Sequence, residues 1–93
     1  MAVQAHDQEA AHRLAVSISY NGMNQSVEYV PEQPARAIRE QALNIYNVHG
    51  PEREQNFLFG PDNQTEINLD ARMGSQVQPG SQVYLRPRTA AGG

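Results

Sequence analysis

The sequence predicts a small α+β domain, in which one helix packs across a mixed sheet of four to five strands. Three observations predict it: alternating apolar residues with a turn dipeptide over residues 14–30, a helical apolar stripe over residues 35–47, and short apolar segments between residues 57 and 85. The chain has 93 residues, and a domain of this size buries only about 60–65% of its unfolded surface. We therefore expect one compact core with little room for a deep substrate pocket.

Residues 14–30 have the pattern of two half-buried strands joined by a tight turn. Val16 and Ile18 alternate with small polar residues, which places the apolar side chains on one face of a strand. Asn21-Gly22 follows, and both residues tolerate the positive φ that a type I′ turn requires. The segment therefore predicts a β-hairpin.

The helix is predicted over residues 35–47, directly after two prolines that are tolerated at a helix start. Its apolar residues fall at i, i+4 and i+7, namely Ile38, Ala42 and Ile45. This spacing makes a stripe that can cover a sheet. Gly50, followed by proline, is expected to end the helix.

Three more strands are expected in the second half of the chain. They fall at residues 57–59, 65–69 and 83–85, each bounded by turn residues. Residues 52–55 are expected to be a charged connection, and residues 70–78 an irregular segment with one helical turn.

Two strands, a helix and three strands in this order form the β-grasp arrangement, in which the last strand returns to the centre of the sheet. A helical crossover joins strands that pair in parallel through a right-handed connection. We expect this domain to span residues 14–87. A mobile arm at residues 1–13 precedes it, and a flexible tail at residues 88–93 follows it.

The composition excludes several classes of function. The net charge of −3 argues against nucleic acid as a partner, because phosphate binding needs a dense basic surface. Without cysteine, disulfides, thiolate nucleophiles and zinc–thiolate sites are excluded. No apolar run approaches the ~20 residues that cross a bilayer, and residues 1–12 lack the pattern of a secretory signal. We expect a cytoplasmic monomer that binds no membrane.

Residues that could carry catalysis are not grouped in this sequence. His6, His12 and His49 are too scattered to form a metal site with nearby carboxylates. We expect no metal, no cofactor and no enzymatic activity. All seven cationic residues are arginine, so lysine-linked chains of residues 1–93 on themselves are impossible.

Three passages in order carry a resemblance to a known family. They are N-V-H-G-P-E-R-E-Q-N-F-L-F-G, where a helix ends at a glycine and a strand follows, Q-P-G-S-Q-V-Y-L-R-P-R, a last strand with an arginine-bearing exit, and the final Gly92-Gly93. From residue 14 to residue 93 the chain resembles ubiquitin and the ubiquitin-like modifiers. The lack of cysteine and lysine and the N-terminal arm are unlike the common eukaryotic members. The chain looks more like the bacterial modifiers encoded beside their own activating, conjugating and deconjugating enzymes, systems implicated in phage defence.

The resemblance implies a protein modifier with Gly93 as the conjugated residue. An E1-like enzyme would activate the Gly93 carboxylate with ATP, and an E2-like enzyme would pass it to target proteins until a deconjugating protease removes it. Gly92 and Gly93 lack Cβ, so an extended tail can pass close to catalytic groups. The resemblance also implies that Arg86 or Arg88 is read by acidic residues of the activating enzyme, since a guanidinium pairs bidentately with a carboxylate.

A partner surface patch is expected on the open face of the sheet. If Phe57 and Phe59 point into the core, Leu58 points outward at the position where the family has an anchor of its recognition patch. The companion position on the last strand falls near Arg86, which is not apolar. We therefore expect a patch of Leu58 and Arg86 that differs from that of ubiquitin.

Two alternatives share this fold. A sulfur carrier would convert the terminal carboxylate to a thiocarboxylate, although such carriers are usually shorter and lack an N-terminal arm. A pure interaction module would never be activated, and a terminal Gly-Gly is not expected of it.

Overall fold

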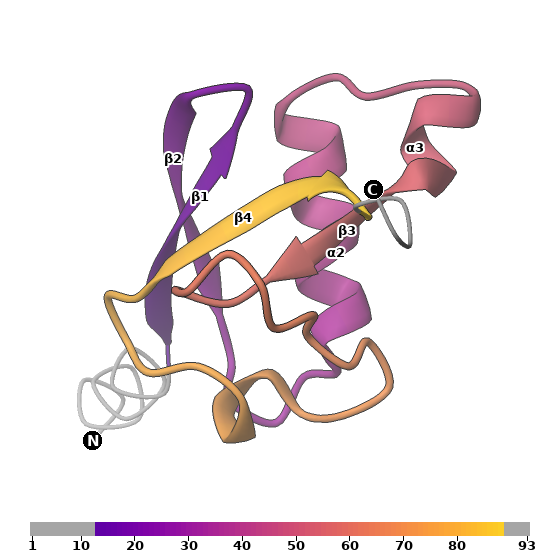
Figure 1. The fold of residues 1–93 in the computed structure, drawn as a ribbon. Coiled ribbons are helices and arrows are strands. Elements are labelled where there is room, and N and C mark those ends of the chain that lie inside the picture. Colours follow the sequence, from indigo (N-terminus) through magenta and orange to yellow (C-terminus); the bar gives the residue numbers. More distant parts are fainter. Residues whose placement is uncertain (1–12, 89–93) are drawn as a thin grey trace, which may run out of the picture.

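The computed structural model describes residues 13–88. The expectations for the N-terminal arm up to residue 12 and for residues 89–93 lie outside this range. The elements, in chain order, are β1 (Leu14–Tyr20), β2 (Met23–Tyr29), α2 (Ala35–Ile45), α3 (Pro51–Gln55), β3 (Asn56–Phe59), the 3₁₀ turn η1 (Met73–Ser75) and β4 (Gln82–Pro87) (Figure 1).

The predicted hairpin is confirmed. Strands β1 and β2 pair antiparallel in continuous register from Leu14 opposite Tyr29 to Tyr20 opposite Met23. The turn residue Asn21 has φ 52° and is followed by a glycine with φ 82°, the left-handed pair that matches the twist of the two strands.

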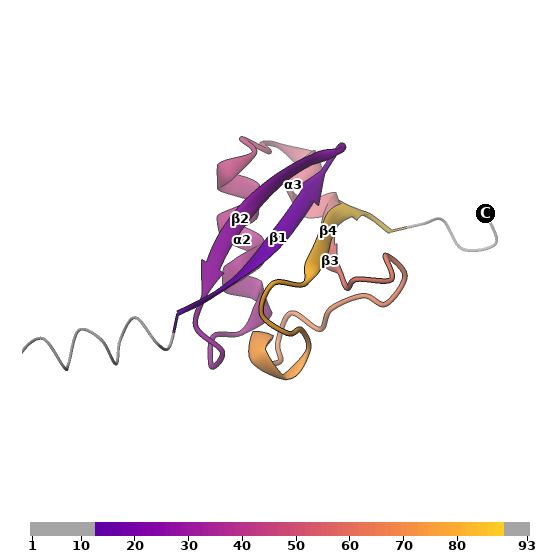
Figure 2. The ribbon, with the colours of Figure 1, turned by 90° about the vertical axis from the view of Figure 1, so that its left-hand side faces the viewer.

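The described residues form a four-stranded mixed sheet in the order β2-β1-β4-β3. Strand β4 pairs parallel with β1 and antiparallel with β3, so the last strand does return to the centre. Helix α2 lies across one face of this sheet, behind the hairpin in Figure 2. The predicted α+β fold and β-grasp arrangement are therefore confirmed, with four strands in the range of four to five.

Helix α2 ends before the glycine that was expected to end it. Asn47 adopts a left-handed conformation with φ 57°, and the N–H of Val48 reaches back to the carbonyl of Leu43 at 2.9 Å, a Schellman-type end. Gly50, with φ 65°, instead precedes Pro51 at the start of the short helix α3. The predicted charged connection at residues 52–55 is therefore helical.

The apolar stripe of α2 is correct in part. Ile38 and Ala42 are fully buried, but Ile45 is 44% exposed because it lies in the last turn, beyond the edge of the core. Arg39 is buried in the middle of the helix, and its Nε donates to the carbonyl of Asn56 at 2.7 Å. This bond ties α2 to the start of β3.

The predicted strand at residues 65–69 is wrong. The segment makes one isolated bridge, between Glu66 and Phe59, and the N–H of Ile67 donates to the carbonyl of Leu58 at 2.9 Å. Ile67 is buried, whereas Asn68 is exposed, so the period-2 pattern comes from a loop that closes over the core. The irregular segment with one helical turn is confirmed as the region around η1.

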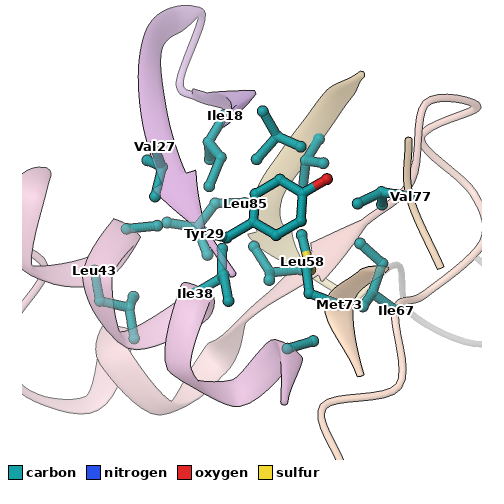
Figure 3. Packing of buried hydrophobic residues seen from close by; sticks show 14 of the residues in the cluster. Ile18, Val27, Tyr29, Ile38, Leu43, Leu58, Ile67, Met73, Val77 and Leu85 are labelled. Atoms are coloured by element: carbon teal, nitrogen blue, oxygen red, sulfur yellow. The ribbon is translucent and has the colours of Figure 1, made fainter. Parts of the chain in front are cut away.

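The core lies between α2 and the inner face of the sheet (Figure 3). Side chains from every strand and from α2 meet in one cluster that also takes in the loop before β4. Leu58 of β3 and Leu85 of β4 sit opposite each other in the register and are both buried in this cluster. This pairing fixes which side chains of β3 and β4 face away from the helix.

Candidate functional site

The outer face of β3 and β4 carries the predicted site residue Arg86 beside two aromatic side chains. The register places Phe57 opposite Arg86, and Phe59 opposite Tyr84. Because side chains alternate along a strand, all four point away from the face that Leu58 and Leu85 occupy. They make up the outer face of the sheet at the end of β4.

The predicted orientation of Leu58 is wrong. Leu58 is 0% exposed and cannot belong to a surface patch. Phe59 is nearly as buried, at 4% exposed, but it is covered from the outer side by an arginine. The expectation assumed that Phe57 and Phe59 point into the core, whereas both rings lie on the outer face of the sheet and each has an arginine guanidinium over it.

Arg86 lies over Phe59. Its guanidinium carbon is 3.7 Å from the ring centroid, close enough for a cation–π interaction. Its Nε donates to the Asn63 side-chain oxygen at 2.7 Å, and its Nη2 donates to the Asn63 carbonyl at the same distance. Its Nη1 donates to the carbonyl of Pro87. The acceptors of these bonds are neutral, and they hold Arg86 against the sheet.

Arg88 lies over Phe57, with its guanidinium carbon 4.0 Å from the ring centroid. It also makes a bidentate ion pair with Glu66: Nε donates to Oε1 at 2.9 Å and Nη2 to Oε2 at 2.8 Å. The Arg88 side chain is 61% exposed and that of Glu66 33%. Phe57 has a second cation nearby, the buried Arg39, whose guanidinium carbon is 5.3 Å from the ring centroid.

The ion pair changes the protonation equilibrium of both partners. Hydrogen bonds donated by Arg88 lower the pKa of the Glu66 carboxyl, with further lowering from the charges of Arg88 and Arg86, while partial desolvation opposes the change. The hydrogen bonds to Glu66 raise the pKa of Arg88. Both effects favour the charged pair at neutral pH.

The loop at residues 60–67 supplies the partners of both arginines, since it carries Asn63 and Glu66. Asp62 organises this loop: the backbone N–H groups of Thr65 and Gln64 donate to its carboxylate, as does the Thr65 hydroxyl. These bonds lower the pKa of Asp62 to about 2. The loop therefore holds its shape at neutral pH and positions Asn63 and Glu66 beside the outer face.

The sequence-predicted site residues fall into three groups. Arg86 and Arg88 lie together at the end of β4, Leu58 lies in the core, and Gly92 and Gly93 are outside the described residues. Sequence reasoning missed Phe57 and Glu66. If Leu85 is taken as buried, the pairing of β3 with β4 places Leu58 in the core and Phe57 on the outer face beside Arg86. Glu66 lies in a loop, where no local sequence pattern predicts its position.

Within residues 13–88, no group of three or more histidine or acidic side chains is placed to hold a metal ion. In the same range, no helix is long and apolar enough to cross a bilayer.

Solved structures resemble this arrangement. A de novo designed protein based on ubiquitin has a TM-score of 0.69 at 19% identity, covering 88% of this chain and 96% of that chain. The ubiquitin of Caldiarchaeum subterraneum has a TM-score of 0.62 at 15% identity, covering 84% of this chain and 96% of that chain. ATBAG1, solved in complex with HSP70, has a TM-score of 0.67 at 16% identity, covering 85% of this chain but 42% of that chain.

No protein-family model and no curated protein matches the sequence. Identities below a fifth establish the fold and nothing finer. The chain has a ubiquitin-like fold.

Proposed function

We propose that this protein is a ubiquitin-like modifier, activated at Gly93 and transferred to target proteins. One observation carries the proposal: on a ubiquitin-like fold, the last strand leads through an exposed Arg88 into Thr89-Ala90-Ala91-Gly92-Gly93. The arginine can be read by a carboxylate-bearing enzyme, and the glycines can pass through a narrow channel.

The proposed chemistry belongs to the enzymes and not to this chain. The Gly93 carboxylate attacks the α-phosphate of ATP, forming an acyl-adenylate and releasing pyrophosphate. A thiolate of the E1-like enzyme then attacks the acyl carbon and releases AMP, which divides one difficult acylation into easier steps. Transfer through an E2-like enzyme to a nucleophile on the target, and removal by a deconjugating protease, complete the cycle.

Two finer placements are part of the same proposal. The resemblance to bacterial modifiers encoded beside their own enzymes suggests a dedicated conjugation system, with phage defence as its context. The absence of lysine fits a modifier that does not build lysine-linked chains of itself.

The test is a tryptic digest of total protein from the native host, prepared under denaturing conditions. Trypsin cuts after Arg88 and only poorly at Arg86-Pro87, so conjugated targets carry a Thr-Ala-Ala-Gly-Gly remnant. We expect that remnant on other proteins, and its loss in a strain whose chain lacks Gly92-Gly93. Purified protein with the same deletion should melt at nearly the wild-type temperature.

The same experiment separates the alternatives. If no remnant is found and the free protein is heavier by exchange of one oxygen for sulfur, the protein is a sulfur carrier with a C-terminal thiocarboxylate. If neither is found and the deletion strain behaves as wild type, the interaction module is the better account. The intact mass also defines the mature C-terminus.

A further inference from the structure

Arg88 is held by two residues distant in sequence, the Glu66 carboxylate and the Phe57 ring, and these three residues form the Arg88 site. The carboxylate takes two nitrogens of the guanidinium at 2.9 and 2.8 Å, and the ring lies 4.0 Å from the guanidinium carbon. A planar, bidentate guanidinium is suited to both contacts together, which a lysine ammonium is not. These contacts connect Arg88, the residue directly after β4, to β3 and to the loop before η1.

Glu66 is held in place by the backbone around it. It bridges to Phe59, and the next residue, Ile67, is buried in the core with its N–H bonded to the carbonyl of Leu58. The backbone therefore holds Glu66 beside the end of β4, so that its carboxylate is within reach of Arg88. A fixed anion loses less conformational entropy when it pairs than a mobile one does.

The two arginines at the end of β4 differ in how they are tied to the fold. Arg86 donates to the backbone carbonyls of Asn63 and Pro87 and to the Asn63 side chain, and its guanidinium lies directly on Phe59. Arg88 is more exposed, and it donates to a carboxylate. An acidic side chain of a partner can replace Glu66 on Arg88 with the same geometry and charge. Moving Arg86 would instead break bonds to the backbone.

We propose that Glu66 is an intramolecular competitor that controls the availability of Arg88, and that the partner reading this end of the sheet is an acidic protein surface that displaces Glu66. When Arg88 leaves, the outer side of Phe57 loses its cover, so the matching partner surface has a carboxylate with an apolar contact beside it. That this partner is the activating enzyme rests on the proposed function, whereas the Arg88 site does not.

Trypsin is a direct probe of this competition, because its specificity pocket binds arginine through a carboxylate. Cleavage after Arg88 in the native, full-length protein requires the guanidinium to leave Glu66. The rate is measured by mass spectrometry relative to cleavage after Arg13, an exposed arginine whose nearby acid is Glu28. That internal reference corrects for differences in trypsin activity and protein concentration, and the melting temperature reports any general loosening of the fold.

We expect Glu66→Gln to raise the relative rate of cleavage after Arg88 about two- to fivefold, the range for losing one well-aligned surface ion pair while the aromatic contact remains. Phe57→Leu should raise it as well, and the double variant should exceed either single one. Glu32→Gln is the matched control, since it changes the net charge equally at an exposed position with no ion pair among residues 13–88; its rate should equal that of the wild type.

A Glu66→Gln rate equal to that of the control, with an unchanged melting temperature, would overturn the proposal. Because the measurement uses no conjugation enzyme, that result would leave the modifier hypothesis intact. Conversely, a host digest without remnants would refute the modifier and leave the Arg88 site standing.

Discussion

Replacing Leu58 by alanine tests which face of β3 is turned toward the core. Leu58 is 0% exposed, lies opposite Leu85 in the strand pair, and belongs to the main apolar cluster. Truncating a leucine in such a position removes its burial and leaves a cavity, at a cost of about 3 kcal/mol in the free energy of unfolding. That is a large part of the roughly 5–15 kcal/mol that stabilises a native domain.

The assay is urea unfolding, followed by far-ultraviolet circular dichroism because the chain has no tryptophan. With a dependence on urea of about 1.5 kcal/mol per molar, typical of a small domain, the midpoint should fall by about 2 M. Leu58→Met keeps most of the volume and should cost less than about 1.5 kcal/mol.

Ile45→Ala is the matched control, since Ile45 is 44% exposed in the last turn of α2. It should change the free energy of unfolding by less than about 1 kcal/mol. If Leu58→Ala were no more destabilising than Ile45→Ala, Leu58 would be at the surface, and the outward orientation of Phe57 and Arg86 would be wrong with it.

Two other predictions follow from the loop and turn geometry. The lowered pKa of Glu66 means that its pairing contributes stability above the pH at which unfolded glutamate titrates, and that this is lost as the pH falls through the folded pKa. In a carbon-13 NMR titration, Glu66 should therefore protonate at lower pH than an ordinary glutamate, and Arg88→Gln should remove most of the difference; an unchanged midpoint would contradict the ion pair. Gly22→Ala places a side chain at φ 82° and should cost about 1–2 kcal/mol in thermal unfolding, whereas Gly60→Ala, at an ordinary φ with no contact closer than 3.7 Å, should cost less. Equal losses would show that the turn does not need its positive φ.

The elements with strong local signals could be predicted from the sequence. The hairpin follows from period-2 alternation and Asn21-Gly22, and its φ values match the turn that the dipeptide favours. The determinants of the hairpin lie within a few residues of one another. The return of the last strand to the centre is different, because it pairs Ser17 with Gln82, and it was expected from the order of strands and helix, with a helical connection long enough to allow parallel pairing.

The errors have non-local causes. Leu58 lies on a strand of four residues, too short for alternation alone to decide which face is buried. Its neighbours Phe57 and Phe59 are large and apolar. They remain on the outer face because arginines from α2 and from the end of the chain near β4 lie over their rings. The loop with Ile67 imitates a strand because a single buried isoleucine is flanked by exposed polar residues. Avoiding either error would have required knowledge of contacts between segments far apart in the chain.

The stacked arginines also bear on the kind of partner this face can bind. Phe57 and Phe59 would leave an apolar patch on the sheet if they were bare, and such patches favour association with other apolar surfaces. With Arg86 and Arg88 over the rings, the face presents guanidinium groups instead. A receptor that relies on an apolar contact alone would have to displace both arginines without offering them new acceptors, which leaves charged groups poorly paired. An acidic receptor supplies the acceptor that Arg88 needs when it leaves Glu66, and it gains the Phe57 ring at the same step. The proposed preference for an acidic partner therefore has a physical basis in how the rings are covered, even though the chain as a whole carries a net negative charge.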